Sequence, residues 1–571
     1  MNNDLKIYCK NTQEYIDIDG GDTLQQIYET IEKRLPFRPI CALVNNKIED
    51  LRFPVYSPKM VEYVGAMSQQ GIRVYVHSLC MVLYKAIEDL FPGKRLRIEH
   101  SISGGYYCKI KHEEELLTIE NIERIKSRMQ EIVDQDIKFV RRERLTTDVV
   151  EMFRKQGLSD KVRLLESSDD LYTVFYKLDN IIDSYYEPLA PSTGYLTAFN
   201  LEPYKDGMLL LGPDPEDETK PRKSYPMEKM YKAFTDYVKF NDIVGLDDVG
   251  TLNIGIEKGW APEIINVAEA LHDKMFARIA DDITERYHNG GARVVLIAGP
   301  SSSGKTTSSK RLAIQLLTNY IVPKVISLDN YFVDRNHTPR DENGDYDYES
   351  LYALDLEQFN NDLKALINGE EVKMPTYNFH TGEREYRGDT LQLKENNILL
   401  MEGIHGLNPE LTKEISEEMK YRVYVSALTT LSIDDHNWVS TSDNRLLRRI
   451  VRDYKYRGVN AQATIARWPS VRRGEEKWIF PYQENADAML NSSLLFELAV
   501  MKDQAEHILK QVPNNVPEYA IASRLLRFLK YFKSIADAPT AVPSTIPGSS
   551  TSLIPSTSLI REFLGGSSFR D

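Results

Sequence analysis

The sequence predicts an α/β protein whose C-terminal half contains a parallel β-sheet with helices on both faces. Four apolar runs, VVLIAG, KVISLD, NILLMEG and YRVYVSA, alternate with segments of helical periodicity. Continuous apolar runs of this length are typical of strands that are buried on both faces of a parallel sheet. The pattern is different before this sheet, where we expect a β-grasp module followed by a second α+β module.

Length and composition indicate several globular domains rather than one core. The chain has 571 residues, and at roughly 100–200 residues per domain three or four are expected. Its 42% hydrophobic and 27% charged residues are ordinary for globular proteins. The net charge of −14 argues against nonspecific binding to nucleic acid or an anionic membrane, although a local basic patch remains compatible with it.

Cysteine usage and hydropathy indicate a cytoplasmic protein. The start, MNNDLKIYCK, has no apolar signal core, and no apolar run approaches the roughly 20 residues that span a bilayer. No CxxC spacing occurs among the four cysteines, Cys9, Cys41, Cys80 and Cys108. We therefore expect neither a disulfide framework nor a cysteine-rich zinc site.

The N-terminal half divides into two modules and a connecting segment. Residues 1–66 combine strand-like alternation, a turn at IDGGDTL and a helical QQIYETIEKRL, which predicts the β-grasp fold. Residues 67–215 contain helical patterns in SLCMVLYKAIEDLF and over 118–136. The charged, proline-bearing PDPEDETKPRKSYP then predicts a linker, and residues 216–290 are expected to be this linker followed by helices that end at NGG.

The C-terminal half is expected to hold the parallel sheet over 291–510 and a helix and tail over 511–571. The tail is rich in Pro, Ser and Thr from 538 to 558, which predicts a loop or tether. The apolar SLIREFLGG that overlaps its end could dock on the fold again.

A phosphate-binding motif follows the first strand of this sheet. GPSSSGKT matches G-x-x-x-x-G-K-[ST] and opens the helical TSSKRLAIQLL. Its glycines let backbone N–H groups approach phosphates, Lys305 can neutralise the β and γ oxygens, and Thr306 can bind magnesium. An ordinary Gly/Ser turn is the alternative, which the strand–loop–helix context disfavours. The predicted nucleotide contacts are Gly299, Pro300, Ser301, Ser302, Ser303, Gly304, Lys305, Thr306 and Thr307.

Two acids follow other strands of the same sheet. Asp329 comes directly after a strand, near the sheet edge where ligands bind, and its carboxylate can accept the proton of an acceptor hydroxyl. Glu402 ends NILLMEG, where an acid can hold magnesium directly or through water. Each could instead cap a helix, so neither decides the function alone.

Basic residues are concentrated further along the chain. Arg445, Arg448, Arg449 and Arg452 of RLLRRIVRDYKYRG share one face of a helix. They form either a phosphate-binding row or a solvated basic face. The later ARWPSVRRGEEKW could close over phosphates as a lid and exclude water. It contributes Arg467, Arg472, Arg473 and Lys477.

Taken in order, GPSSSGKTT, SLDNYF, DYDYESLYALD, MPTYNFHTGERE, LLMEGIHGL and RRIVRD resemble the uridine kinase and phosphoribulokinase family over about 293–499. The resemblance implies a P-loop kinase that uses ATP and Mg²⁺. It implies that Asp329 is the general base and that Asp329, Thr306 and Glu402 lie at magnesium. The implied catalytic set is Lys305, Asp329, Arg449 and Arg452. The implied acceptor contacts are Asp347 at ribose hydroxyls, Tyr377 beside the base, His380, Arg384, Arg449 and Arg452.

Three positions depart from the family pattern. Phe332 stands where a tyrosine is common, Gly382 aligns with the base-reading histidine, and Val459 replaces an arginine of a later R-G-R element. These changes leave the phosphoryl-transfer residues in place. They keep the identity of the acceptor open between a nucleoside and a sugar or sugar phosphate.

The N-terminal modules resemble other families. Residues 1–66 are similar to a TGS domain, and about 67–212 are similar to the second additional domain of threonyl-tRNA synthetase, through VHSLCMVLYKAIEDLFP and PLAPSTGYLTAF. That family carries an HxxxH pair and a later Cys and His. Here His77 remains, but Met81, Tyr185 and Leu189 replace the other three. We expect no zinc and no editing chemistry, but a module that senses or binds a ligand such as RNA.

Three functions therefore remain in view. The first is ATP-dependent transfer to a small-molecule hydroxyl, foremost the 5′-hydroxyl of a nucleoside. The second is a kinase of a non-nucleoside sugar or sugar phosphate. The third is a nucleotide-regulated RNA-binding protein, which the acidic balance disfavours but a locally binding TGS module would permit. No membrane partner is expected, and oligomerisation remains open.

Overall fold

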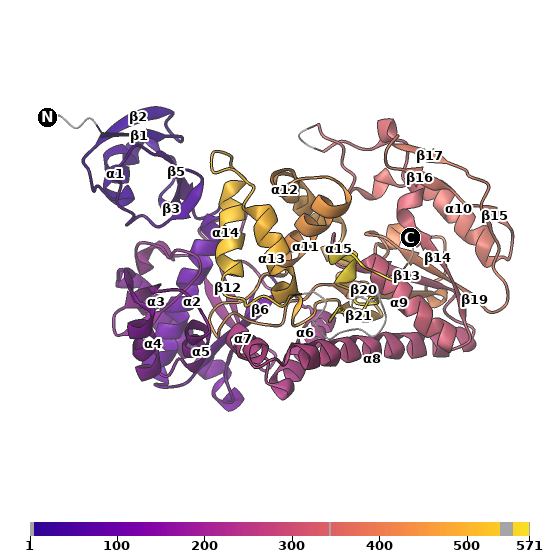
Figure 1. Ribbon diagram of the computed structural model, residues 1–571, viewed down its shortest axis with the longest axis horizontal. Helices are drawn as coiled ribbons and strands as arrows, with labels where there is room; N and C mark the ends of the chain where they lie inside the picture. Colours follow the sequence, from indigo (N-terminus) through magenta and orange to yellow (C-terminus); the bar gives the residue numbers. More distant parts are fainter. Residues whose placement is uncertain (1–4, 342–343, 537–551, 570–571) are drawn as a thin grey trace, which may run out of the picture.

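A computed structural model describes residues 5–341, 344–536 and 552–569 (Figure 1). At the N-terminus, a five-stranded sheet has the order β2-β1-β5-β3-β4, in which β1 and β5 are parallel and the other pairs antiparallel. Helix α1 (Leu24–Ile31) packs on it, and a Thr23–Gln26 capping box fixes its start. The predicted β-grasp fold is confirmed. The strands are β1 Leu5–Cys9, β2 Glu14–Ile18, β3 Pro39–Val44, β4 Lys47–Glu49 and β5 Met60–Gly65.

The second module is built around helix α2 (Gly71–Leu90), which is buried over most of its length and therefore serves as a core helix. Two antiparallel sheets surround it, in the orders β11-β12-β7-β6 and β10-β9-β8. Helix α3 (Ile119–Asp134) packs against α2, and α4 (Thr146–Lys155) packs against α5 (Ser159–Glu166). The strands are β6 Leu96–Ile102, β7 Gly105–Ile110, β8 Val140–Leu145, β9 Tyr172–Leu178, β10 Ile181–Asp183, β11 Asn200–Tyr204 and β12 Gly207–Leu211.

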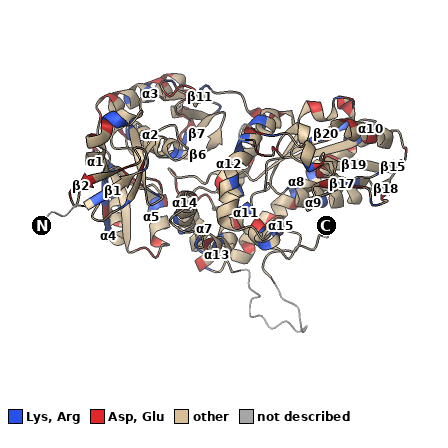
Figure 2. Cartoon of the chain, turned by 90° about the horizontal axis from the view of Figure 1, so that it is seen from above, with Lys and Arg blue, Asp and Glu red and all other residues tan. Residues whose placement is uncertain are grey.

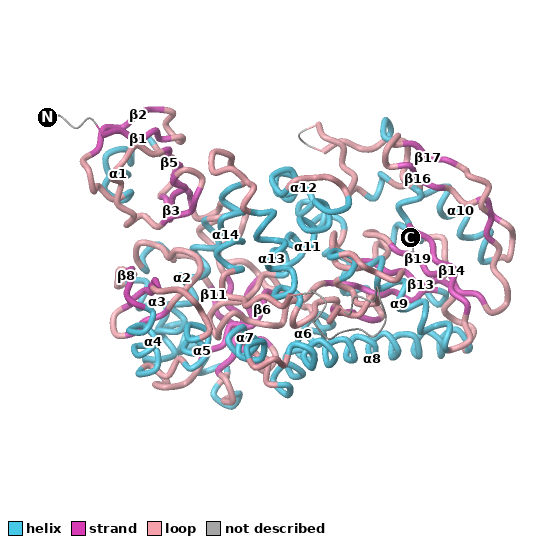
Figure 3. Tube along the Cα trace, in the orientation of Figure 1, coloured by secondary structure: helices cyan, strands magenta, loops and turns pink. Residues whose placement is uncertain are grey.

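Three helices join the modules to the C-terminal sheet. The predicted linker, residues 213–226, contains no helix or named strand. Helices α6 (Glu228–Val244) and α7 (Val249–Glu257) follow it. The predicted long helix is α8 (Ala261–His288), an unbroken rod along the lower edge of the molecule in Figures 1 and 3. It ends at His288, and Gly290, two residues further on, has a φ of 79° that suits glycine.

The C-terminal sheet is entirely parallel and has the order β14-β19-β13-β20-β21. Val295 and Ile297 of β13 (Val294–Ala298) face α8 and α9 (Lys305–Thr318), whereas Val294 and Leu296 face α10 (Leu356–Ile367). Both faces are therefore covered, as predicted. The other strands are β14 Val322–Ser327, β19 Asn397–Glu402, β20 Lys420–Ser426 and β21 Ala488–Asn491.

Helices α11 and α12 lie between the N-terminal sheets and the parallel sheet in the two perpendicular views of Figures 1 and 2, and α14 contacts β4 of the N-terminal sheet. The stretch proposed as a lid forms α12, which contains Pro469. The tether expected at 538–558 lies largely outside the described residues, but the SLIREFLGG segment docks and contains α15. The helices are α11 Thr441–Tyr456, α12 Ala461–Trp478, α13 Glu497–Leu509, α14 Tyr519–Leu529 and α15 Arg561–Leu564.

Short hairpins complete the C-terminal half. β15 (Val372–Lys373) pairs with β18 (Thr390–Leu391), and β16 (Thr376–Asn378) pairs with β17 (Glu383–Glu385). Throughout the described ranges, each helix is too short or too polar to cross a bilayer.

Candidate functional site

The glycine-rich loop connects the central strand β13 to α9 at the carboxyl edge of the parallel sheet. A Cβ atom on Gly299 would lie 2.0 Å from the Val425 carbonyl oxygen, so this position requires glycine. Gly304 begins the helix at φ 86°. The hydroxyls of Ser302 and Ser303 are buried without a hydrogen-bond partner among the described residues. The loop thus provides the close backbone approach and spare polar atoms of an anion site.

Two of the four predicted arginines support this loop from beneath. Arg445 is buried, pairs with both carboxylate oxygens of Glu475 at 2.5 and 2.7 Å, and donates to the Ser301 carbonyl oxygen at 3.2 Å. The Ser301 N–H donates to Glu475 at 3.0 Å. Arg448 is buried against Glu497 and donates to the Ser492 carbonyl oxygen at 2.8 Å. These two arginines are structural supports, contrary to a uniform phosphate-binding row.

The other two arginines, which we call the rim arginines, are less deeply buried than Arg445 and Arg448, and one of them contacts the loop. Arg449 donates to the Ser301 hydroxyl at 2.9 Å and pairs with Asp453 at 3.3 Å. Arg452 pairs with Asp453 at 3.0 Å. Their side chains are 14% and 16% exposed, so they remain accessible to a ligand over the loop.

The register of the parallel sheet places the two predicted acids together. Ser327 of β14 lies opposite Glu402 of β19 and donates to its carboxylate at 3.2 Å. The Asp329 N–H donates to the same Ser327 hydroxyl at 3.3 Å. Burial, and secondarily the neighbouring Asp329 carboxylate, raise the pKa of Glu402 to about 7. Burial also raises the pKa of Asp329, which the Lys305 ammonium opposes.

Lys305 lies between the loop and these acids. Its ammonium donates to the Pro300 carbonyl oxygen at 3.2 Å and lowers the pKa of both Asp329 and Glu402. Two acids that sequence reasoning did not identify share this region. The Glu562 carboxylate accepts hydrogen bonds from the Thr307 N–H at 3.2 Å and the Thr307 hydroxyl at 2.9 Å.

Glu349 is the second such acid. Its Oε2 is buried without a hydrogen-bond partner among the described residues. Burial, and then the Glu475 carboxylate, raise its pKa to about 7, while Arg449 and Lys305 oppose this rise. It follows Asp347 by two residues, and neither motif nor spacing distinguished it from the other acids of this tyrosine-rich stretch.

The predicted acceptor residues lie in the region that follows Asp329. Tyr377 is buried on β16, and its ring lies 5.4 Å from that of Phe332. Asp347 accepts from the Glu349 N–H at 3.2 Å, which holds it in a local turn. Arg384 pairs with Asp355 at 2.9 Å, and His380 is exposed at the hairpin turn. The Tyr377 N–H donates to the side chain of Asn330, which places Tyr377 close to Asp329. Among the described residues, His380 and Arg384 form no hydrogen bond or ion pair with the glycine-rich loop, Asp329 or Glu402.

The departures from the family pattern have packing explanations. Phe332 fills an aromatic cluster with Tyr377 and Phe379. Gly382 has a φ of 79°, and a Cβ there would meet Arg335 at 2.6 Å. A histidine at this position would therefore be strained and would clash. The structure offers no explanation for Val459.

In the second module, an aromatic cluster surrounds the remaining histidine. His77 of α2 is buried, and its ring stacks on Trp438 at 4.8 Å with the planes 8° apart. Tyr185 contacts it edge-on at 5.8 Å. Met81 and Leu189 are fully buried in the same apolar core. These side chains fill the positions where the resembled family has metal ligands.

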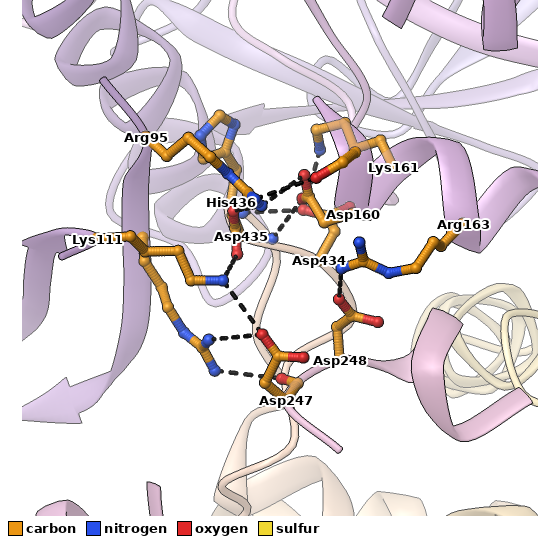
Figure 4. Close-up of polar contacts among 12 residues, drawn as sticks. Arg95, Lys111, Asp160, Lys161, Arg163, Asp247, Asp248, Asp434, Asp435 and His436 are labelled. Atoms are coloured by element: carbon orange, nitrogen blue, oxygen red, sulfur yellow. Dashed lines mark hydrogen bonds and ion pairs between the residues drawn. The ribbon is translucent and has the colours of Figure 1, made fainter. Parts of the chain in front are cut away.

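Trp438 comes from the C-terminal half, on residues 427–440 between β20 and α11, which we call the strap. Residues 427–439 of the strap are buried. Figure 4 shows three residues of the strap, Asp434, Asp435 and His436, among basic and acidic side chains that include Lys111 and Lys161 of the second module. Lys161 pairs with Asp434 at 2.9 Å, and Lys111 pairs with Asp435 at 2.9 Å. The strap thus fastens the two halves of the chain together.

The strap leads directly into α11, which carries the rim arginines. At the start of α11, Asp443 accepts paired hydrogen bonds from Arg73 of α2 at 3.1 and 3.2 Å. Arg524 of α14 donates to the same carboxylate at 2.6 and 2.8 Å. The second module therefore helps to set the position of Arg449 and Arg452.

Comparison with known proteins gives two different matches along the chain. Residues 294–495 match the profile of the Phosphoribulokinase / Uridine kinase family. A uridine kinase of Staphylococcus aureus (strain JH9) is 28% identical over 198 residues, which cover 34% of this chain and 86% of that protein. A structure titled as a possible uridine kinase from Bacillus stearothermophilus is 19% identical and covers 38% of this chain and 98% of its own, with a TM-score of 0.26.

The N-terminal region matches threonine–tRNA ligases. The ligase of Desulforamulus reducens is 31% identical over 182 residues, which are 32% of this chain. The chain spans only 28% of the length of that ligase.

Proposed function

We propose that this chain, whose residues 294–495 form a domain of the Phosphoribulokinase / Uridine kinase family, is an ATP-dependent kinase of a small-molecule hydroxyl. One observation carries the proposal. The glycine-rich loop, its lysine and two strand-end acids meet at one edge of the sheet, and Lys305 opposes the raised pKa of both Asp329 and Glu402. This arrangement is suited to phosphoryl transfer, which depends on positioning and charge stabilisation.

The side chains fit a nucleotide and magnesium. Buried hydroxyls of Ser302 and Ser303 have spare hydrogen-bonding capacity, and the Thr306, Asp329 and Glu402 oxygens are the donor type that Mg²⁺ prefers. Among the described residues, no three His, Cys, Asp or Glu side chains form a ready metal cluster. We therefore assign Thr306 and Glu402, with Asp329 beside them, as the residues that would hold Mg²⁺, which would neutralise charge on the phosphates.

The protein groups have separate roles in this proposal. Lys305 binds the transferring phosphoryl group, and Arg449 and Arg452 stabilise its negative charge from the rim. Asp329 accepts the proton of the acceptor hydroxyl, and its raised pKa makes it a better base than an ordinary aspartate. Helix α12 is held to the loop through Glu475, which accepts a hydrogen bond from the Ser301 N–H.

The acceptor that we propose first is the 5′-hydroxyl of a nucleoside, with Asp347, Tyr377, His380, Arg384 and the rim arginines as its contacts. A non-nucleoside sugar or sugar phosphate is the second candidate. The observation in its favour is Gly382, because Arg335 occupies the space that a base-reading side chain would need. We also propose a cytoplasmic location, which the four buried free cysteines support.

The test is a transfer assay with labelled ATP and a panel of nucleosides, sugars, sugar phosphates and tRNA. Transfer to a nucleoside 5′-hydroxyl supports the first acceptor, and transfer to a sugar alone replaces it with the second. Saturable tRNA binding that changes with ATP, without transfer to any acceptor, would favour a nucleotide-regulated RNA-binding protein. Absence of both nucleotide binding and transfer would reject the kinase proposal.

A further inference from the structure

The C-terminal segment, residues 552–569, lies on the glycine-rich loop although it is the last described part of the chain. Its Leu559 is fully buried in the core that also holds Val295 and Ile297 of β13. A Cβ atom on Gly304 would lie 3.2 Å from Leu559 and 3.7 Å from Ser492. The segment therefore packs directly against the turn that begins α9.

Its Glu562 side chain supplies an anion to this turn. The carboxylate accepts from both the N–H and the hydroxyl of Thr307, at 3.2 and 2.9 Å. The first turn of a helix has N–H groups without intrahelical partners and carries the positive end of the helix dipole. In a G-x-x-x-x-G-K-[ST] loop these same groups hold nucleotide phosphates. A carboxylate of the protein thus occupies an anion position of the phosphate cradle.

The surroundings make it unfavourable for this carboxylate and a phosphate to be present together. Glu562 acts on Glu402, where its negative charge adds to the effect of burial and of Asp329 in raising the pKa. A nucleotide would bring further negative charge to acids that already lie around Lys305. Like charges at such short range oppose one another, so binding of one anion weakens binding of the other.

The segment is also connected to the helix of the rim arginines. Arg448 and Lys455 of α11 both contact the segment. The Phe563 ring lies 5.0 Å from the Arg448 guanidinium, and the Leu564 carbonyl oxygen accepts a hydrogen bond from Lys455. Movement of Glu562 away from Thr307 would therefore disturb contacts of the helix that positions Arg449 and Arg452.

We propose that residues 552–569 are an internal competitor of the nucleotide, in which Glu562 holds a phosphate position until MgATP displaces it. The proposal rests on the proposed function, because it takes Gly299 to Thr307 to be the nucleotide site. In this scheme the apparent Kd equals the intrinsic Kd divided by the fraction of molecules in which the segment is released. The segment sets how much nucleotide is needed to open the site.

The test compares full-length wild type with Glu562→Gln, which keeps the shape of the side chain but removes its charge. We expect the Kd for MgADP and MgATP, measured by calorimetry, to fall about tenfold in Glu562→Gln, because the weakened contact increases the released fraction. Glu410→Gln is the matched control, since this acid is exposed and forms its ion pair with Lys413 rather than with a residue of the loop. It should leave the Kd unchanged.

Hydrogen exchange of wild type provides a second measurement that does not depend on a variant. MgADP should increase the exchange of amides within 558–566 while it protects the glycine-rich loop. Greater protection of 558–566, or an unchanged Kd in Glu562→Gln, would overturn the competitor and leave the segment as a structural or closing element. Lys305→Ala separates the two proposals. If wild type binds nucleotide and Lys305→Ala does not, the kinase site stands whatever Glu562→Gln shows. If wild type binds no nucleotide, both proposals fail.

Discussion

The indole of Trp438, from the strap, stacks on the imidazole of His77 at 4.8 Å with the two planes 8° apart. One ring belongs to the C-terminal half and the other to the module that resembles a tRNA synthetase domain. His77 is the residue that we expect at a ligand position of the resembled family, and the contact joins it to the strap that leads into α11.

Lys305→Ala should weaken MgATP binding or turnover by about ten- to a hundredfold, because the phosphate cradle loses a charged hydrogen-bond donor. Binding is measured by calorimetry and turnover with labelled ATP. The circular dichroism spectrum should not change, since Lys305 makes its hydrogen bond only to Pro300 among the described residues. Unchanged binding and turnover would remove this loop as the catalytic site.

Asp329→Asn should lower turnover by about 10²–10⁴-fold while most MgATP binding remains, because an amide nearly keeps the shape but cannot take the hydroxyl proton. Single-turnover transfer and nucleotide calorimetry on the same preparation separate the two effects. Transfer that persists at the wild-type rate would rule out Asp329 as the general base.

Asp347→Ala and Glu349→Gln should identify the carboxylate that binds the acceptor. Asp347 is held in a local turn, whereas Glu349 has a buried oxygen without a partner. We expect the acceptor KM to rise about tenfold for the residue that contacts a substrate hydroxyl, with the KM for ATP unchanged. Equal KM values for both variants and wild type would mean that neither acid contacts the acceptor.

The purified protein should contain no stoichiometric zinc in residues 67–212, because Met81, Tyr185 and Leu189 stand at three expected ligand positions. Elemental analysis after dialysis provides the measurement. One tightly held zinc that disappears in His77→Ala would show that the ligand assignment is wrong.

His436 should make the free energy of unfolding depend on pH, because it lies in the contact between the strap and the second module. Burial alone would lower its pKa, but the Asp183 carboxylate at 2.7 Å raises it, while Lys161 opposes and Asp160 supports that rise. A raised folded pKa gives stability that is fully present below about pH 6.5 and is lost as pH rises through the folded value. Urea unfolding of wild type at several pH values should show this loss.

The His436→Gln variant should lack this component of the pH dependence, whereas the exposed His337→Gln should retain it. Identical pH profiles for wild type and His436→Gln would contradict the assignment. The contribution of His436 is taken as the difference between the pH profiles of wild type and variant, because carboxylates of the same network also change the free energy of unfolding with pH.

The parallel sheet and its glycine-rich loop were predictable because their signals are local. Apolar strands, the eight-residue GPSSSGKT motif and the residues at strand ends all lie within short segments. The docked position of Glu562 was not predictable, because 255 residues separate it from Thr307. The strap was missed for the same reason. Its burial depends on partners such as Lys161 and His77 in the other half of the chain, and its polar DDHN sequence has the composition of a surface loop.

The supporting roles of Arg445 and Arg448 show a further limit of prediction from the sequence. Helical spacing correctly places four arginines on α11, but it does not reveal which of them meet buried acids. Glu475 and Glu497 come from α12 and α13, and only the packing of these helices decides that Arg445 and Arg448 are internal while Arg449 and Arg452 stay at the rim.

Helix α8 contributes side chains to two different hydrophobic cores, so the rotation of one of its ends relative to the other must suit both cores. Ile264 and Ile265 near its start belong to the core of α11 to α13, whereas Phe276 and Ile283 belong to the core beneath the parallel sheet. At 3.6 residues per turn, each inserted residue rotates one end of a helix by about 100° relative to the other. A single residue inserted between these two groups would turn one apolar stripe away from its core, whereas seven residues, close to two full turns, would nearly restore the angle. The chain can therefore tolerate a change in the length of this rod only in steps that come close to whole turns, such as about 7 or about 11 residues, provided that the added length is itself accommodated.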